Sequence, residues 1–282
     1  MNRRTKLAIA AAVALGLIAL AVWRIEAASA RILATRYPQP AAPLAVTPTP
    51  AMAANGERLA RLDGCASCHG KALTGRVIVS GFLGTKLVAP NLTALARHRS
   101  DEQLAAAIRY GVRRDGTSLI NMPVGKFLRS SDSDIAAIIA YLKSLPARPD
   151  AAGRTHWGFG GRAMLAMGLM PIEAAMLDRS QRGPHQTPTA PMARGHYLTQ
   201  VYCTVCHGPD LTGEPQQDSP GLRFSIKHYS LAVFERFFTT GIARKGHGTQ
   251  TMTPMIKARF RYMTKQDVRA IFTYLNNSKP GE

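Results

Sequence analysis

Apolar side chains recur with a helical period at the end of each half of the chain. Between residues 135 and 142 they occur at i, i+3, i+4 and i+7, and the same spacing returns between residues 268 and 275. Ser131 and Thr264 stand just before these segments in Ser/Thr-x-x-Asp patterns, which resemble the capping box that starts a helix. The pattern therefore predicts a closing amphipathic helix in each half.

Shorter segments with helical periodicity lie in the middle of each half. Residues 104–110 and 231–238 favour helices, and each is followed by a glycine, Gly111 or Gly241, as is typical of helix ends. Alternating patterns typical of strands are scarce. We therefore predict an all-α fold with long loops in both halves.

The N-terminus carries an uncharged apolar run over residues 7–23, preceded by Arg3, Arg4 and Lys6. Its 17 residues would span roughly 26 Å as a helix, close to the thickness of a bilayer core. We therefore expect residues 1–30 to form a retained transmembrane signal anchor. Cleavage after Ala30, behind a small-residue pattern, is the alternative, and in both cases the rest of the chain is exported.

Residues 31–51 are rich in proline, with prolines at 38, 40, 43, 48 and 50. Such a composition predicts a stiff, extended spacer, up to ~40 Å long at ~3.1 Å per residue, that would hold the next domain away from the membrane.

A second boundary lies within residues 148–192, which we predict to be an interdomain linker. Its apolar stretch, residues 164–177, is interrupted by Pro171 and Glu173, so it cannot span a bilayer. We expect a helix packed on a domain, with contact to a membrane surface as the alternative. Domain 1 is then assigned to residues 52–147 and domain 2 to residues 193–282.

The two domains repeat each other. The pattern Cys-x-x-Cys-His occurs at residues 65–69 and 203–207, and Leu-Thr-Gly follows at the same distance in each copy. Gly56 upstream matches Gly195 with a slip of one residue, and a constant offset of 133 then pairs the later residues. Internal duplication is the simplest account.

Cys-x-x-Cys-His is a motif for covalent haem attachment. The two thiols form thioethers with the two haem vinyl groups, and the histidine that follows is carried beneath the iron as its proximal ligand. The predicted binding residues are Cys65, Cys68, His69, Cys203, Cys206 and His207. A zinc site would need closer cysteine pairs, and a disulfide or redox dithiol would not need the histidine. The two motifs predict two covalently bound haem c groups.

The second axial ligands are predicted to be Met122 and Met255. Each lies on an irregular, proline-marked segment before the closing helix, and the 133-residue offset pairs them with each other. Met252 is the rival in domain 2, and His247 is a possible substitute. In domain 1, Pro90 follows His69 by 21 residues and could offer a carbonyl to its second ring nitrogen, as metal-ligating histidines require. In domain 2, Pro220 is a weaker candidate. The other histidines are expected to face solvent.

The formal net charge is +19. This charge suits attraction to an acidic protein or to anionic lipid, and no nucleic-acid motif accompanies it. Cations are dense around both methionines: Arg113, Arg114, Lys126 and Arg129 near Met122, and Arg244, Lys245, Lys257, Arg259, Arg261 and Lys265 near Met255. We expect these two rims to dock an acidic redox protein.

Together these motifs give each half a resemblance to class I bacterial cytochrome c domains. The shared features, as they stand in domain 1, are Gly56, the Cys-x-x-Cys-His motif, Pro90-Asn91-Leu92-Thr93, Met122-Pro123 and residues 141–146. The whole chain is similar to membrane-anchored dihaem cytochromes c of bacteria. The resemblance implies a helical fold around each haem, His/Met ligation and a periplasmic location at the inner membrane. Domain 2 departs from it because no proline follows Met255.

The function this favours is electron transfer in a respiratory chain, without catalysis. Two filled axial positions let an iron exchange electrons but leave no place for a small-molecule substrate. The partner would be a redox protein, or a dehydrogenase or oxidase of which this chain is the cytochrome subunit. A dihaem peroxidase, which would need one displaceable ligand, is the alternative.

Overall fold

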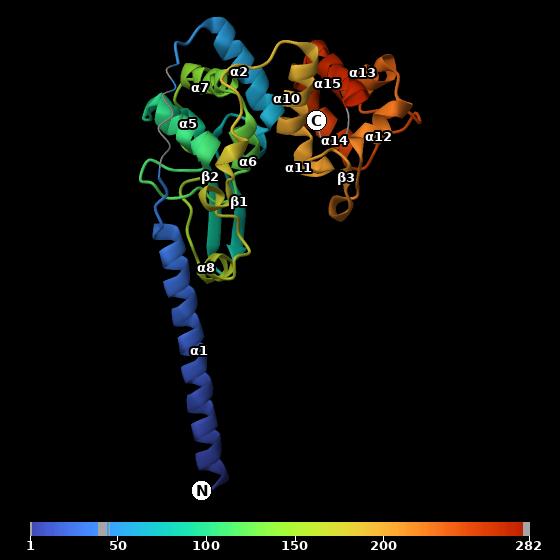
Figure 1. Ribbon diagram of the computed structural model, residues 1–282. Helices are drawn as coiled ribbons and strands as arrows, with labels where there is room; N and C mark the ends of the chain where they lie inside the picture. The colour runs from blue at the N-terminus through green and yellow to red at the C-terminus, as the bar shows by residue number, and fades with distance from the viewer. Residues whose placement is uncertain (1, 39–43, 45, 279–282) are drawn as a thin grey trace.

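The computed structural model describes residues 2–38, 44 and 46–278. One long helix, α1, leads into domain 1, and domain 2 lies beside domain 1 on the side away from α1 (Figure 1). Hydrophobic side chains of both domains form one continuous core cluster. The two domains are therefore packed against each other rather than joined by an open linker.

Helix α1 runs from Arg3 to Ala34, and the side chain of Asn2 caps its first turn. Within the described residues it is the one helix long and apolar enough to cross a membrane. The expected anchor segment is confirmed as an apolar helix, although the helix continues past residue 30. A helix of this kind fits either an anchor or a signal sequence.

Domain 1 is built on two crossing helices, α2 (Pro50–Asp63) and α7 (Asp132–Ser144). Gly56 lies at the crossing, where a Cβ would be only 1.9 Å from the carbonyl oxygen of Ala137. Only glycine lets the two backbones approach so closely. The other helices of this domain are α3 (Cys65–His69), α4 (Leu92–Arg97), α5 (Asp101–Tyr110) and α6 (Val124–Arg129).

Domain 2 repeats this crossing with α10 (Pro191–Tyr202) and α15 (Lys265–Asn277). A Cβ on Gly195 would lie 2.1 Å from the carbonyl oxygen of Ala270, so the paired glycines serve the same packing. Further helical elements are α11 (Thr204–His207), α12 (Leu222–Ser225), α13 (Leu231–Thr240) and α14 (Met252–Ala258), with 3-10 turns η2 (Pro215–Gln217), η3 (Ile226–His228) and η4 (Phe260–Tyr262).

The middle and closing helices confirm the periodicity. Gly111 and Gly241 end α5 and α13 in the left-handed conformation, with φ of 65° and 75°. At the start of the closing helices, the hydroxyls of Ser131 and Thr264 accept the backbone N–H of the residue three positions on. Of the two closing helices, α15 has a full capping box, in which the Asp267 side chain accepts the backbone N–H of Thr264.

The predicted all-α class is confirmed, with one addition in domain 1. Strands β1 (Thr74–Phe82) and β2 (Thr85–Asn91) form an antiparallel hairpin with irregular register between Val77 and Phe82. In domain 2 only two-residue strands occupy the same place, β3 (Gly213–Glu214) and β4 (Ser219–Pro220).

The linker between the domains wraps around domain 1. It holds α8 (Phe159–Ala166), α9 (Glu173–Met176) and the 3-10 turn η1 (Arg179–Gln181). Helix α8 packs against α1 and the end of the hairpin (Figure 1). The apolar stretch 164–177, expected to form a helix packed on a domain, is helical only at the end of α8 and in α9, and residues 167–172 between them are not helical.

Residues 31–51, expected to form an extended spacer that holds domain 1 away from the membrane, contact domain 1 at several described positions. The backbone N–H of Tyr37 bonds the carbonyl of Gly116 at 2.8 Å, and the Arg36 guanidinium bonds the carbonyl of Asp115 at 2.8 Å. Leu44 and Val46 pack against the core, while residues 39–43 and 45 lie outside the described part. Apolar side chains between the prolines gain more from burial on domain 1 than from an extended, solvated path.

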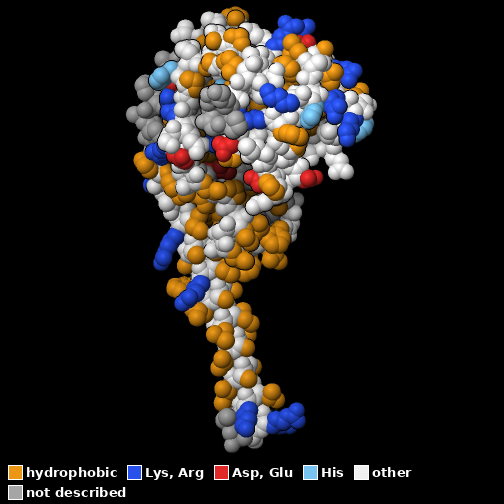
Figure 2. Space-filling model, turned by 45° about the vertical axis from the view of Figure 1, so that its right-hand side comes forward, with side chains coloured by type: hydrophobic (Ala, Val, Ile, Leu, Met, Phe, Trp, Pro, Cys, Tyr) orange, Lys and Arg blue, Asp and Glu red, His pale blue; other side chains and the backbone are white. Residues whose placement is uncertain are grey.

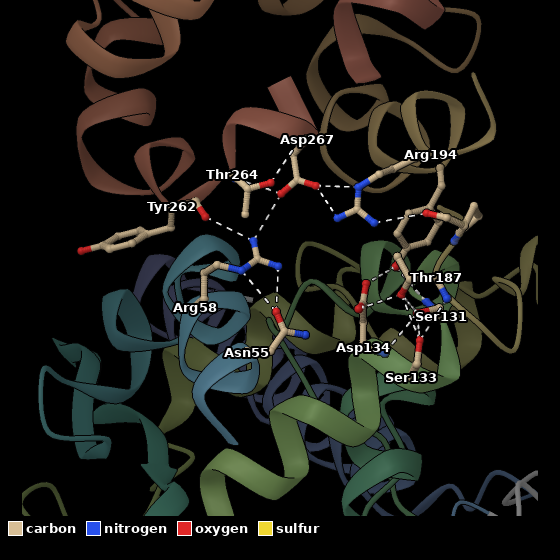
Figure 3. Close-up of polar contacts among 12 residues, drawn as sticks. Asn55, Arg58, Ser131, Ser133, Asp134, Thr187, Arg194, Tyr262, Thr264 and Asp267 are labelled. Atoms are coloured by element: carbon tan, nitrogen blue, oxygen red, sulfur yellow. Dashed lines mark hydrogen bonds and ion pairs between the residues drawn. The ribbon is translucent and has the colours of Figure 1, made fainter. Parts of the chain in front are cut away.

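The interface between the domains has an approximate twofold relation (Figure 3). On one side, Arg58 of α2 contacts Asp267 at 3.4 Å, and Arg194 also bonds that carboxylate. On the other side, the hydroxyl of Tyr197, at the position matching Arg58, donates to Asp134 at 2.6 Å. Asp134 and Asp267 are themselves paired by the 133-residue offset, so duplicated surfaces meet each other.

Candidate functional site

Each Cys-x-x-Cys-His motif sits on a single helical turn directly after the first long helix of its domain. Gly64, left-handed with φ of 74°, turns the chain from α2 into α3, which spans Cys65–His69. In domain 2 no glycine intervenes, and Cys203 itself caps α11. The turn places two thiols and an imidazole within five residues, as covalent haem attachment requires.

The two histidines are buried and held in the same way. Nδ1 of His69 lies 2.8 Å from the carbonyl oxygen of Pro90, and Nδ1 of His207 lies 2.8 Å from that of Pro220. A carbonyl can only accept, so Nδ1–H must donate, and the lone pair remains on Nε2 for a metal ion. Both predicted carbonyl partners are confirmed. Burial lowers the pKa of each histidine, which keeps the imidazole neutral as a ligand must be.

The repeated Leu-Thr-Gly pattern explains how the proline carbonyl reaches the histidine. Leu73 and Leu211 both adopt left-handed backbone, with φ of 58° and 59°, although their side chains are buried. Their carbonyls accept the N–H of Leu92 and Leu222 at 2.8 Å each, two residues beyond the prolines. Such non-glycine strain costs about 1–3 kcal/mol, and here it fixes the second support of each histidine.

The residues that follow the two prolines, Asn91 and Gly221, occupy equivalent positions in the two domains. Sequence reasoning missed this match. Asn91 caps α4 and donates its amide to the carbonyl of Arg148 at 2.9 Å. Gly221 takes its place in domain 2, at the start of α12, where a Cβ would lie 2.5 Å from the carbonyl oxygen of Thr212. The shared Pro-x-Leu spacing at residues 90–92 and 220–222 was the signal for this match.

The four cysteines are unpaired in the structure. Burial raises the pKa of the Cys65 and Cys203 thiols to about 12. Cys68 is exposed, and Cys206 is partly buried. Cys65 and Cys203 are partly buried too, and their raised pKa keeps the first thiol of each pair neutral.

The two predicted methionine ligands differ in their settings. Met122 lies on a non-helical segment between Asn121, with φ of 61°, and the start of α6, as predicted. Met255 lies inside α14 rather than on an irregular loop, so that part of the prediction is wrong. Helix α14 begins at Met252, because without a proline after Met255 the backbone continues as a helix. All three methionines are half-buried against the core, and the choice of axial ligands stays a prediction.

Sequence reasoning missed Glu173, which comes from the linker to support the Met122 segment. Its carboxylate accepts the N–H of Val124 at 3.5 Å, and its own N–H bonds the carbonyl of Leu119 at 3.2 Å. Burial raises the pKa of this carboxyl to about 7, although backbone N–H groups of Val124 and Met122 pull it downward. Domain 2 offers no matching linker segment among the described residues.

The remaining histidines are exposed, as expected: His98, His156, His185, His196, His228 and His247. His247 bonds the carbonyl of its neighbour Gly248 through Nδ1 at 3.0 Å.

Two of the cations assigned to the methionine rims are not available for docking, so the expected rims need correction. Lys126 is buried, and its ammonium contacts the Asp63 carboxylate at 2.7 Å. Arg259 reaches across the interface to the carbonyls of Leu62 and Asp63, at 3.1 and 2.7 Å. Arg259 joins the two domains, whereas Lys126 is paired within domain 1, and sequence alone reveals neither contact.

The residues at both sites fit a covalently attached haem. Each site combines a Cys-x-x-Cys-His turn with a buried histidine whose tautomer leaves Nε2 free, and each domain also has a half-buried methionine packed against the core. The helical fold and this repeated donor set define the class of c-type haem proteins.

The match to known families agrees with that class. The cytochrome c family model matches residues 53–146 and again residues 192–279. The chain belongs to the cytochrome c family, and membership implies covalently bound haem c.

Relatives in three organisms carry related names. The chain is 25% identical over 272 residues to the fructose dehydrogenase cytochrome subunit of Gluconobacter japonicus, covering 82% of this chain and 54% of that protein. It is 30% identical over 176 residues to the alcohol dehydrogenase (quinone) cytochrome c subunit of Gluconobacter oxydans (strain 621H), covering 56% and 35%. Identity to the gluconate 2-dehydrogenase cytochrome c subunit of Pantoea cypripedii is 28% over 172 residues, covering 56% and 38%. The chain thus spans between about a third and about half of these relatives.

Proposed function

We propose that this protein is a membrane-anchored dihaem cytochrome c that transfers electrons as the cytochrome subunit of a membrane-associated dehydrogenase. The observation that carries the proposal is the duplicated site, in which a buried histidine after Cys-x-x-Cys donates to a proline carbonyl at 2.8 Å in both domains. The names of the three relatives, all cytochrome subunits of dehydrogenases, support the partner class. They do not favour the peroxidase alternative.

One haem would be held in each domain. Cys65 and Cys68 would attach the first and Cys203 and Cys206 the second, with His69 and His207 as proximal ligands. When bound, the haem irons supply one-electron redox chemistry. The chain's own part is to keep each imidazole neutral and oriented through the Pro90 and Pro220 carbonyls.

Met122 and Met255 would complete the axial positions. A thioether ligand raises the reduction potential, and a filled position excludes small-molecule substrates. We therefore propose an electron-transfer role without catalysis by this chain itself. Met252 remains the rival to Met255, since both lie on α14 and pack against the core.

The domains would face the periplasm, with α1 retained in the inner membrane. Arg3, Arg4 and Lys6 at its start favour a cytoplasmic N-terminus. If the chain were instead cleaved after Ala30, the last turn of α1 would remain on domain 1.

Electrons could pass between the domains because both attachment segments reach the interface. A Cβ on Gly64, just before Cys65, would lie 2.9 Å from the Arg259 guanidinium of domain 2. Tyr202, just before Cys203, lies with its ring centroid 5.7 Å from the buried Lys126 ammonium of domain 1. The interface contacts would hold the two sites at a fixed separation.

An acidic redox surface remains the proposed docking partner, now on a smaller set of cations. Near Met255 the exposed ones are Arg244, Lys245, Lys257, Arg261 and Lys265. Cations there would raise the association rate with an acidic surface, an effect that salt screens. Charge reversal at Lys245 and Lys257 should therefore slow electron transfer to the partner more than reversal at Lys71, next to the first haem motif.

Purification in mild detergent tests the whole proposal. The haem colour should stay with the polypeptide after acid-acetone extraction, and the pyridine haemochrome assay should give two haems per chain. A flavin- or quinone-linked dehydrogenase should co-purify and reduce both haems when given its substrate.

Matched variants separate the parts of this test. Cys65→Ala with Cys68→Ala, and Cys203→Ala with Cys206→Ala, should each leave one haem. A single haem in the unaltered chain, or bound zinc, would refute the dihaem proposal. Two haems with an oxidase as the sole co-purified enzyme would refute the dehydrogenase partner alone.

A further inference from the structure

The end of domain 1 that lies nearest α1 is depleted of charge. Residues 77–85, which form the end of the hairpin around its turn, and residues 163–172, which follow Arg162 in the linker, carry no Asp, Glu, Lys or Arg. The chain as a whole has 36 Lys and Arg and 17 Asp and Glu. Two uncharged stretches, of nine and ten residues, therefore lie at the end of domain 1 where α1 enters.

The start of α8, which leads into the second stretch, packs with the hairpin as one unit. The N–H of Gly161 bonds the Thr85 hydroxyl at 2.7 Å, and Lys86 exchanges two backbone hydrogen bonds with His156, at 2.9 and 2.8 Å. A Cβ on Gly160 would lie 2.5 Å from the ring of Phe82. The glycines of α8 thus let the linker lie directly on the end of the hairpin.

This unit exposes large apolar side chains rather than burying them. Leu83 is 59% exposed, Met167 67% and Leu169 61%. Val79, Phe82 and Phe159 are exposed as well. We call the exposed set of residues 79, 82, 83, 159, 167 and 169 the apolar foot. Figure 2 shows hydrophobic side chains gathered where the stalk of α1 meets the domain.

Helix α8 fixes the height of the apolar foot along α1. The Arg162 guanidinium contacts Glu26 at 3.2 Å and the hydroxyl of Ser29 at 3.2 Å. Glu26 stands three residues after Trp23, the end of the apolar run, which is about 4.5 Å along a helix. The foot is therefore level with the zone where a membrane-spanning α1 leaves the hydrocarbon.

We infer that the apolar foot inserts into the headgroup region of the membrane beside α1, as a second, monotopic contact of domain 1 with the lipid. The inference rests on the proposed retention of α1 as an anchor. Apolar side chains on an element at this depth can bury themselves at the boundary between headgroups and acyl chains, and Trp23 marks the same boundary on α1.

The position of the apolar foot beside α1 favours lipid over a protein as the partner that covers it. The foot is continuous with the lipid-facing surface of α1, whose Leu15, Leu17 and Ile18 are all more than half exposed. A bilayer that surrounds α1 must reach the foot, whereas a soluble partner would have to displace headgroups to cover it. The foot would then fix how domain 1 is turned relative to the membrane.

Photo-crosslinking in intact membranes tests the inference. A photoreactive benzoylphenylalanine replaces Leu83 or Leu169 in the full-length holoprotein. Phe224, an apolar side chain of domain 2 that is 75% exposed, serves as the matched control, and Leu15 within α1 serves as the lipid control. After irradiation, intact-mass measurement distinguishes a phospholipid adduct from a polypeptide adduct.

We expect phospholipid adducts at positions 83 and 169 at several-fold higher yield than at position 224. Adducts to polypeptide alone, or no more lipid than at position 224, would overturn the inference. The control at position 15 separates this result from failure of the anchor. If the mature chain begins after Ala30, or position 15 captures no lipid, the anchor proposal fails on its own, while the adducts at 83 and 169 still decide the foot.

Discussion

The two domains share one framework and differ in what is added to it. In both, a glycine permits a close crossing of the first and last helices, and a proline carbonyl orients the histidine. The proline follows the histidine by 21 positions in domain 1, with a two-stranded hairpin in between, and by 13 positions in domain 2, with almost no strand. Since the shorter segment orients His207 as well as the longer one orients His69, the hairpin is not needed for the site. Its length serves the surface toward α1.

The methionine segments differ in a similar way. In domain 1 the segment is non-helical and is supported by Glu173 from the linker, whereas in domain 2 it is part of α14. The interface also uses different chemistry on its two sides. Asp267 is met by two arginines, and Asp134 by the hydroxyls of Tyr197 and Thr187. Duplication thus preserved positions while the contacts diverged.

Among these predictions, the largest difference in stability between the two domains should come from substitution of the paired aspartates. Asp267→Ala would leave the charges of Arg58 and Arg194 without their carboxylate, at a cost of about 3–5 kcal/mol. Asp134→Ala would remove hydrogen bonds from neutral donors, at about 1–3 kcal/mol. Denaturant unfolding of the holoprotein measures both. Equal losses would mean that the two sides of the interface are energetically alike.

The glycine crossings should behave alike in the two domains. Gly56→Ala and Gly195→Ala each force a Cβ to within about 2 Å of a carbonyl oxygen, and we expect a loss of about 3 kcal/mol from either. Gly125→Ala, on α6 with nothing within 4 Å of the added Cβ, is the control and should be neutral or stabilising. Thermal unfolding followed by circular dichroism gives the comparison. If alanine were tolerated at only one of the two glycines, the two helix crossings would not be equivalent.

Substitution of the predicted axial methionines should affect one haem at a time. Met122→Ala and Met255→Ala should each abolish one sulfur-to-iron absorption band and lower the potential of one haem by on the order of 0.1 V, within the ~0.8 V that axial ligands span. Redox titration followed by absorption measures both. If Met252→Ala has this effect and Met255→Ala does not, Met252 is the axial ligand and the assignment of Met255 is wrong.

The smallest expected change is in the pH dependence of stability, and it comes from Glu173, whose pKa is raised to about 7 by burial. A raised pKa favours the folded state at low pH, so stability should be full below about 4.5 and decline as pH rises through 7. Glu173→Gln should remove this decline and stabilise domain 1 at pH 8 by about 1–3 kcal/mol, since one pKa unit is ~1.4 kcal/mol. Thermal midpoints at pH 5 and pH 8 test it. Glu57→Gln, on the exposed face of α2, should leave the pH dependence unchanged.

Periodicity, capping patterns and the repeat predicted most of this architecture from sequence. The closing helices, the glycine stops and the carbonyl partner of His69 follow from local spacing, whereas Pro220 was only a weak candidate for His207. The hairpin was missed because residues 77–85 are apolar on both faces and contain glycines, so no alternation marks a strand.

Long-range burial could not be predicted from local patterns. Prolines predicted an extended spacer, but Leu44 and Val46 between them pack on the core. Lys126 and Arg259 counted as surface cations until the fold placed them against Asp63 and the carbonyls beside it. Met255 was expected on a loop because its neighbours resemble those of Met122, yet the missing proline lets α14 form.

The interface also has a consequence for the order of assembly. Its contacts join residues far apart in the chain, with Arg58 and Asp267 separated by 209 positions and Asp63 and Arg259 by 196. Contacts of such high contact order form late, because both partners must be synthesised and compact before they meet. A chain exported from its N-terminus presents the first haem motif well before the second. We therefore expect domain 1 to mature alone, with its Asp63–Lys126 face open to water until domain 2 arrives and closes it.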